Sequence, residues 1–267
     1  IRRPSRSTLC PSTTHFRATF NPLDVEAFVR EMKAKGRYLV ALIVLFKDQR
    51  LHEYSRGAYA VWDGAQGIPW RGYEWEKKEI PIPAPEGAPP STAAPATTTV
   101  TEKKFYGEYW VDPYSEKVWE YNVAIAREII ARGFDEVQFD YIRFPTDGVN
   151  LDDARYRWKD AGMDMESALM SFLSYARANI DAPISIDIYG ANGWYRSGVR
   201  TGQDVELLAR YVDAICPMFY PSHFEQTFMG FEPAVQRPYR IYKLGTLRNS
   251  YIARKRVVVR PYVQAFY

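Results

Sequence analysis

The feature that most constrains the fold is a repeated order in which an amphipathic helix is followed at once by a short apolar strand. The clearest strand, residues 39–46 (LVALIVLF), is apolar on both faces, as is typical of a parallel strand buried between two layers. It follows a predicted helix that begins at Asn21 and Pro22, ends at Gly36 and carries one apolar stripe. This order predicts an α/β protein with a parallel sheet.

The same order recurs along the chain. A second helix is expected to begin at Asp112 and Pro113 and to end at Gly133, immediately before a strand at 136–144 (EVQFDYIRF). Further elements are predicted as helices at 165–180 and 203–211 and strands at 184–189, 212–220 and 256–266.

The length of 267 residues suits one (β/α)8 TIM-type barrel, which usually has about 250 residues. Only five strands are evident, and residues 50–75 are a candidate for one more. An incomplete barrel, or one truncated at its N-terminus, therefore stays open beside the complete one. The chain also begins with Ile1 rather than Met, which fits a processed or truncated start.

Two segments stand apart from this barrel, which we place at residues 21–267. Residues 1–20 show no periodicity and are expected to form an irregular N-terminal segment. Residues 81–101 (PIPAPEGAPPSTAAPATTTVT) form a low-complexity stretch rich in Pro, Ala and Thr, which cannot bury apolar surface. Because this stretch falls between a strand and the next helix, we interpret it as an inserted flexible loop.

Composition and motifs exclude several classes of function. The net charge is only +3, with Lys and Arg scattered, which does not support a nucleic-acid partner. The longest apolar run, residues 38–46, is too short for a transmembrane segment, which needs about 20 residues. The sequence has no nucleophile elbow, phosphate-binding loop or dinucleotide-binding turn, and Gly245 alone does not make a phosphate site. We therefore expect no cofactor.

A metal site is also not expected. The three histidines have no HxH or HExxH spacing, and the two cysteines, Cys10 and Cys216, are far apart and form no CxxC motif. Whether these two cysteines pair stays open, as does the oligomeric state. The 7 Trp and 20 Tyr are mostly expected in the core, but such rings also suit a cleft that stacks on sugars.

Unusual polar residues fall on the predicted strands, towards the ends where parallel α/β proteins gather their reactive groups. Gln138 and Asp140 share one face of their strand, and Asp187 interrupts the apolar strand ISIDIY. A buried carboxylate costs several kcal/mol unless it is paired, so a structural ion pair could explain either Asp alone. Two such carboxylates on successive strands instead suggest a pair with separated pKa values, which glycosidic cleavage requires.

The segment 133–148 (GFDEVQFDYIRFPTDG) closely resembles the signature of a bacterial family of glycoside hydrolase barrels, long classed as a domain of unknown function. The segments 41–48, 109–129, 214–224 and 260–266 resemble the same family, in the same order. The resemblance covers most of the regular chain. It implies a TIM-type barrel that acts as a secreted glycosidase on a poly- or oligosaccharide, outside the cell or in the cell envelope.

The chain also departs from related patterns. Its 136–144 strand more loosely resembles catalytic strands of amylase-type and chitinase-type barrels. Gln138 and Ile142 replace the middle Asp and the catalytic Glu of the chitinase type, so that substrate-assisted mechanism is not supported. Gln138 also replaces the Arg of the amylase type, and Arg143 is a candidate for the missing positive charge. The opening strand of the family, which ends in lysine and aspartates, is not found.

We expect Asp140 to be the nucleophile or the carboxylate that stabilises an oxocarbenium ion, and Asp187 to be the general acid/base or to orient a sugar hydroxyl. Seven residues are candidates for binding substrate: Lys47, Asp48, Arg143, Trp194, Tyr220, His223 and Gln264. Retention or inversion at the sugar stays open. The alternative function is a non-catalytic carbohydrate-binding or envelope-associated barrel that keeps the cleft without the catalytic machinery.

Overall fold

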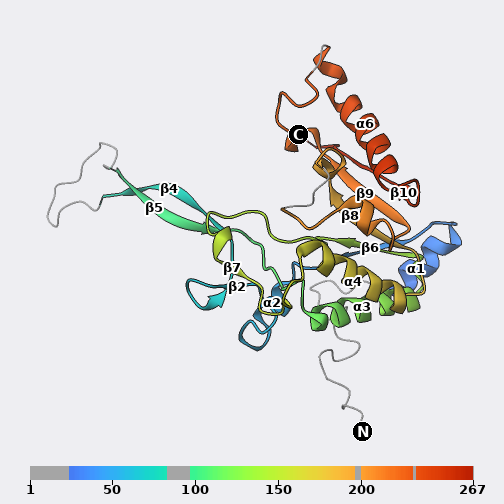
Figure 1. Cartoon of the computed structure of the whole chain (residues 1–267), viewed down its shortest axis with the longest axis horizontal. Helices are drawn as coiled ribbons and strands as arrows, with labels where there is room; N and C mark the ends of the chain where they lie inside the picture. Colours follow the sequence, from blue (N-terminus) through green and yellow to red (C-terminus); the bar gives the residue numbers. More distant parts are fainter. Residues whose placement is uncertain (1–23, 83–96, 196–199, 231–232, 267) are drawn as a thin grey trace, which may run out of the picture.

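The computed structural model of the chain describes residues 24–82, 97–195, 200–230 and 233–266 (Figure 1). The N-terminal segment 1–20, with Cys10, lies outside these residues, as do the expected helix start at Asn21 and Pro22 and most of the Pro-rich insertion. The first helix is described from Val25, and Asp24 caps it by accepting a hydrogen bond from the amide of Ala27 at 2.8 Å.

A parallel sheet forms the centre of the molecule, in the α/β arrangement that the sequence predicts. Its strands are β1 (Val40–Val44), β6 (Glu136–Asp140), β8 (Ile184–Tyr189), β9 (Ala214–Phe219), β10 (Val258–Val259) and β11 (Tyr262–Val263). The order is β1-β6-β8-β9-β10, and β11 also pairs with β9 further along. Each strand therefore lies beside its predecessor in the sequence, without the reversal of order that marks a doubly wound sheet.

Helices cover one face of this sheet (Figure 1). The helices are α1 (Val25–Ala34), α2 (Gln49–Glu53), α3 (Glu116–Ala131), α4 (Met165–Asn179), α5 (Val205–Leu208) and α6 (Arg237–Ile252). Short 3-10 turns lie at Tyr54–Arg56, Leu151–Asp153, Gly190–Gly193, Pro221–His223 and Ala234–Gln236. In the part of the chain that the structure describes, no helix is long and apolar enough to cross a membrane.

Several predicted boundaries need correction. Helix α3 begins at Glu116 rather than at Asp112, because the Asp112 carboxylate closes a turn instead, accepting from the amides of Tyr114 at 3.0 Å and Trp158 at 3.1 Å. The strand expected at 136–144 leaves the sheet after Asp140. The helix expected at 203–211 is only four residues long, and α6 was not predicted at all.

The covered face of the sheet holds an aromatic cluster around Phe172 of α4. The Phe172 ring packs edge-on against Phe139 of β6, Phe46 and Trp119, with ring centroids 5.2, 5.7 and 6.4 Å apart. Phe46, Phe139 and Phe172 are fully buried. This cluster joins the sheet to α3 and α4 and holds the strand that carries Asp140.

Two antiparallel elements lie outside the parallel sheet. Strands β4 (Tyr73–Pro81) and β5 (Thr97–Phe105) form a hairpin that projects from the body (Figure 1). Strands β2 (Trp62–Asp63), β3 (Ile68–Pro69) and β7 (Ala154–Arg155) form a small separate sheet. Residues 50–75 therefore add no strand to the parallel sheet.

The hairpin also narrows the predicted loop insertion. Residue 81 and residues 97–101 pair in the ladder between β4 and β5, because their backbone groups find cross-strand partners although all of their side chains except the half-buried Val100 are exposed. Residues 83–96 lie outside the described part.

The aromatic cluster yields a first prediction. Replacing Phe172 by Ala should lower the free energy of unfolding by roughly 3–5 kcal/mol, since it removes a fully buried ring and leaves a cavity. Urea denaturation measures this loss, with Val235→Ala, at a side chain that is 84% exposed, as the control expected to change little. A loss below about 1 kcal/mol for Phe172→Ala would contradict the proposed role of the cluster.

Candidate active site

The second face of the parallel sheet is polar. In a strand, alternate side chains point to opposite faces, and residues paired in a parallel ladder share a face. Gln138 pairs with Ser185, and Asp187 with Cys216, so these side chains lie on the face opposite Phe139. The polar side chains of this inner face are Glu136, Gln138, Asp140, Ser185, Asp187, Arg260 and Tyr262.

At the amino ends of the strands, Glu136 is fully paired. Its carboxylate forms an ion pair with Arg260 and accepts hydrogen bonds from Ser185 at 2.5 Å and Tyr38 at 3.1 Å. Burial alone would raise the pKa of Glu136, but Arg260 and Ser185 outweigh it and hold the pKa below its ordinary value. This end of the sheet is a structural ion-pair network.

Further along the strands, level with Asp140, Asp187 has fewer partners. Its Oδ1 accepts a 2.5 Å hydrogen bond from the Gln138 amide, which also donates to the Tyr262 hydroxyl at 2.8 Å. The side chain is almost buried, with 3% exposure. Burial raises the pKa of Asp187 to about 7; the Gln138 hydrogen bond opposes this rise and the negative charge of Asp140 adds to it.

At the carboxyl end of β6, Asp140 is half-buried and lies beside the point where the chain leaves the sheet. Its Oδ1 accepts a 2.7 Å hydrogen bond from the amide of Tyr141, whose φ of +52° is in the left-handed region that a bulky residue seldom adopts. Burial raises the pKa of Asp140, while the Tyr141 amide, Arg143 and Lys47 lower it. The strained turn thus places the Asp140 carboxylate next to a backbone amide and near two cationic side chains.

Arg143 and Lys47 are held near Asp140 by aromatic rings. The Arg143 guanidinium lies 4.7 Å from the Trp110 ring centroid, 5.2 Å from that of Tyr141 and 5.0 Å from that of Tyr189. Lys47 lies 4.3 Å from the Tyr141 centroid and donates to its hydroxyl at 3.2 Å. These contacts fix two positive charges beside the carboxylate without neutralising it.

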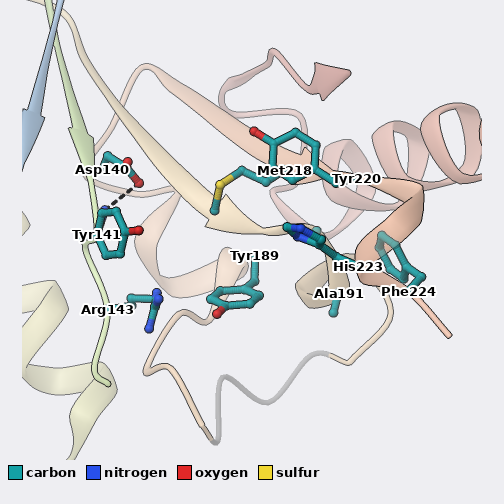
Figure 2. Close-up of a pocket in the computed structure, with 10 residues that line it drawn as sticks. Asp140, Tyr141, Arg143, Tyr189, Ala191, Met218, Tyr220, His223 and Phe224 are labelled. Atoms are coloured by element: carbon teal, nitrogen blue, oxygen red, sulfur yellow. Dashed lines mark hydrogen bonds between the residues drawn. The ribbon is translucent and has the colours of Figure 1, made fainter. Parts of the chain in front are cut away.

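A cleft of about 270 Å³ opens above Asp140. Figure 2 shows Asp140, Tyr141 and Arg143 on one wall and Tyr220, His223 and Phe224 across from them. Its lining residues are Asp140, Tyr141, Arg143, Tyr189, Gly190, Ala191, Met218, Tyr220, His223 and Phe224. A half-buried carboxylate, an arginine and several ring faces are groups suited to holding a sugar.

Among the predicted substrate-binding residues, the structure brings Arg143, Tyr220 and His223 into this cleft, and Lys47 beside it. Asp187 is level with Asp140 along the strands but does not line the cleft. Tyr141, Tyr189, Met218 and Phe224 were missed by sequence reasoning, although each stands within a few residues of a strand end.

Three predicted residues lie elsewhere. Asp48 caps α2 by accepting from the amide of Leu51 at 2.9 Å. The side-chain carbonyl oxygen of Gln264 accepts from the amide of Ser222 at 3.1 Å, which ties the segment after β11 to the loop after β9. Trp194 packs edge-on against Phe219, Phe224 and Phe228, with centroids 5.1–5.7 Å apart.

Two further kinds of site, a metal site and a reactive thiol, can be examined among the described residues. The described residues contain no group of three or more His, Cys, Asp and Glu side chains that could hold a metal ion. Cys216, on the inner face beside Asp187, is a buried free thiol whose pKa burial raises to about 11. A thiol with such a pKa is neutral and poorly nucleophilic at neutral pH.

Comparison with known families gives one match, to a model described as "Putative glycosyl hydrolase domain", over residues 7–267. Comparison with curated protein sequences finds no match.

Among solved structures, a hypothetical protein from Ruminiclostridium thermocellum is 23% identical, with a TM-score of 0.46, over 68% of this chain and 74% of its own. An α-galactosidase from Thermus thermophilus is 16% identical, with a TM-score of 0.50, over 91% and 41%. A trehalulose synthase from Pseudomonas mesoacidophila is 12% identical, with a TM-score of 0.43, over 85% and 42%. The chain thus spans less than half of these two enzymes, and the likeness to the α-galactosidase concerns the fold alone.

The raised pKa of Asp187 predicts a pH-dependent stability. The protonated form is favoured in the folded state, so wild-type stability should fall relative to Asp187→Asn as pH rises from about 4 to about 7. The difference should grow by roughly 1.4 kcal/mol per pH unit in that range. Urea denaturation at pH 4, 6 and 8 measures it.

Glu136→Gln is the matched control, with the opposite sign. Because the folded-state pKa of Glu136 is lowered, its contribution to stability is present at neutral pH and is lost as pH falls through that pKa. A difference between wild type and Asp187→Asn that did not vary with pH would contradict the raised pKa of Asp187.

Proposed function

Because the chain belongs to the family described as "Putative glycosyl hydrolase domain", we propose that it hydrolyses a glycosidic bond of a poly- or oligosaccharide with Asp140 and Asp187. The observation that carries the assignment to these residues is the placement of two carboxyl groups on one face of neighbouring strands in different environments. Burial raises the pKa of both groups, but Arg143 and Lys47 oppose the rise at Asp140, whereas the pKa of Asp187 reaches about 7.

This difference suits the division of labour that glycoside hydrolysis requires. Asp140, at the cleft, acts as the nucleophile or stabilises the developing oxocarbenium ion. Asp187 supplies the proton for the leaving oxygen and takes it back from water. Arg143, Lys47, Tyr220 and His223 contact substrate hydroxyls, while Asp48, Gln264 and Trp194 support the loops around them.

We further propose that the parallel sheet is part of a (β/α)8 barrel. The sequential order of its strands supports this, since a barrel adds each strand beside the last. At the β1 edge, Leu42 and Val44 share the inner face with Gln138 and Asp140 and are 50% and 38% exposed. Further barrel strands against this edge would cover these apolar side chains. A polysaccharide substrate also suits an extracellular or cell-envelope location in a bacterium.

One observation favours a second candidate function, a non-catalytic carbohydrate-binding barrel. Asp187 is only 3% exposed and does not line the cleft, so a sugar oxygen reaches it only if the side chains around Asp140 and Gln138 move apart. A binding protein would need no such movement. Activity measurements on variants decide between the two.

The central test is reducing-sugar release across a panel of bacterial and plant polysaccharides. Asp140→Asn should lower the rate by at least about 10²–10⁴-fold, because it removes the charge at the reacting carbon. Asp160→Asn, at an exposed aspartate far from the cleft residues in sequence, is the matched control and should keep wild-type activity. Full activity in Asp140→Asn would contradict the assignment, and binding without hydrolysis by the wild type would favour the second candidate.

The pH–rate profile tests the role of Asp187. Since the proton donor must be protonated, activity should fall as pH rises past about 7. Asp187→Asn should lower the rate by about 10²–10⁴-fold and remove this alkaline limb from the residual activity. An unchanged limb in Asp187→Asn would assign the proton transfer to another group.

A further inference from the structure

The hairpin of β4 and β5 has two chemically different faces. In its ladder Tyr73 lies opposite Phe105 and Trp75 opposite Lys103, and these four side chains share one face. The alternate positions, among them Glu74, Glu76, Lys78, Glu102 and Lys104, form the other face. An isolated two-stranded hairpin is only marginally stable in water, so the contacts that each face makes matter for its stability.

On the charged face, lysine and glutamate side chains form ion pairs with one another. Lys104 forms ion pairs with Glu76 at 3.0 Å and Glu74 at 3.4 Å, and Lys78 pairs with Glu102 at 3.1 Å. These exposed pairs add little to stability, but they balance the charges within the hairpin. This face therefore presents solvent mainly with paired charges, together with the apolar side chains of Ile80 and Val100.

The aromatic face leaves apolar area in solvent. The Tyr73 ring packs edge-on against Trp75 of the same strand and against Phe105 of the other strand, with centroids 5.4 and 5.6 Å apart, and the contact with Phe105 supports the hairpin across its strands. Trp75 nevertheless stays 54% exposed and Phe105 48% exposed. The Lys103 ammonium lies 4.3 Å from the Tyr73 centroid and 5.8 Å from that of Trp75, so a cation borders the rings.

A continuous row of side chains joins this face to the cleft. Arg71 stacks between Phe105 and Tyr109, with its guanidinium 5.1 and 4.6 Å from their centroids. The next part of this row is a second hollow, which is lined by Tyr106, Gly107, Glu108 and Asp147. Glu108 then binds Lys47 at 3.1 Å, and Lys47 contacts Tyr141 of the cleft. Contacts between neighbouring residues thus link the aromatic face to Tyr141, next to Asp140.

We propose that the aromatic face of the hairpin, defined by Tyr73, Trp75, Phe105 and Lys103, binds the polysaccharide chain beyond the catalytic cleft. The proposal rests on the proposed glycosidase function and extends it to long substrates. The apolar C–H face of a pyranose ring stacks on the exposed faces of Trp75 and Phe105, and the Lys103 ammonium donates to sugar hydroxyl or carboxylate oxygens.

The size of the face favours a glycan over a protein partner. A stable protein interface buries about 800 Å² on each side. Two half-exposed rings, of side chains that bury about 150–250 Å² each when covered, offer far less than this area. A sugar chain needs only one or two ring faces for each subsite, and the projecting hairpin leaves room along its length (Figure 1).

The test is native affinity electrophoresis of the full chain in gels that contain neutral or uronic-acid polysaccharides. Trp75→Ala and Phe105→Ala should each weaken retardation about three- to tenfold in apparent Kd, as expected for the loss of one stacking contact. Trp75→Phe, which keeps a ring, should retain most of the binding. Ile80→Ala, which removes an exposed apolar side chain from the opposite face, should bind as wild type does.

A second measurement compares kcat/KM on a polymer with that on a short oligosaccharide of the same linkage. Their ratio should fall in Trp75→Ala and stay constant in Ile80→Ala. The proposal is overturned if no polysaccharide retards the wild type, if Trp75→Ala binds as well as wild type, or if Trp75 instead supports concentration-dependent dimerisation in light scattering. Retardation that depends on Trp75 without any hydrolysis would contradict the proposed catalysis while supporting the binding face.

Discussion

Burial of polar side chains on the inner face of the parallel sheet is the constraint on which the rest of the structure depends. The opposite face is a dry aromatic cluster around Phe172, so the two-residue repeat places every second side chain of β6 and β8 inside the curve of the sheet. A buried charge without partners costs several kcal/mol. Each inner-face group must therefore be paired, protonated or placed at an opening.

The strands use all three solutions, with Glu136 at their amino ends and Asp187 and Asp140 level with each other towards their carboxyl ends. Glu136 is paired with Arg260, Asp187 keeps its proton to a pKa of about 7 beside Gln138, and Asp140 stands at the cleft. Glu136 is the most fully paired, whereas Asp187 accepts from Gln138 and Asp140 from the Tyr141 amide. The carboxyl groups with fewer partners therefore lie towards the carboxyl ends of the strands, where other parallel α/β proteins place their chemistry.

Strands β1, β6, β8 and β9 and helix α4 could be predicted because their apolar pattern is strong, and Asp140 and Asp187 because charges stand out within it. The single strand expected at 256–266 is instead the two short strands β10 and β11. Helix α6 was missed because its sequence, RPYRIYKLGTLRNSYI, spreads polar residues around the helix, and only Ile241, Gly245 and Asn249 are buried. The hairpin was missed because most of its positions are charged residues or Thr, and its few aromatic side chains do not make a sustained apolar alternation. Packing partners such as those of Trp194 come from distant segments, which no local pattern reveals.

The most direct test of the central claim needs no substrate. Titration of carbon-13-labelled aspartate carboxyl groups by NMR follows the ionisation of Asp187 in the wild type and in Asp140→Asn. The coupled pair predicts a midpoint near pH 7 for Asp187 in the wild type and a lower midpoint in the variant, because the neighbouring negative charge is gone. A midpoint near the ordinary value of about 4, unchanged in the variant, would contradict a catalytic carboxyl pair at these strand ends.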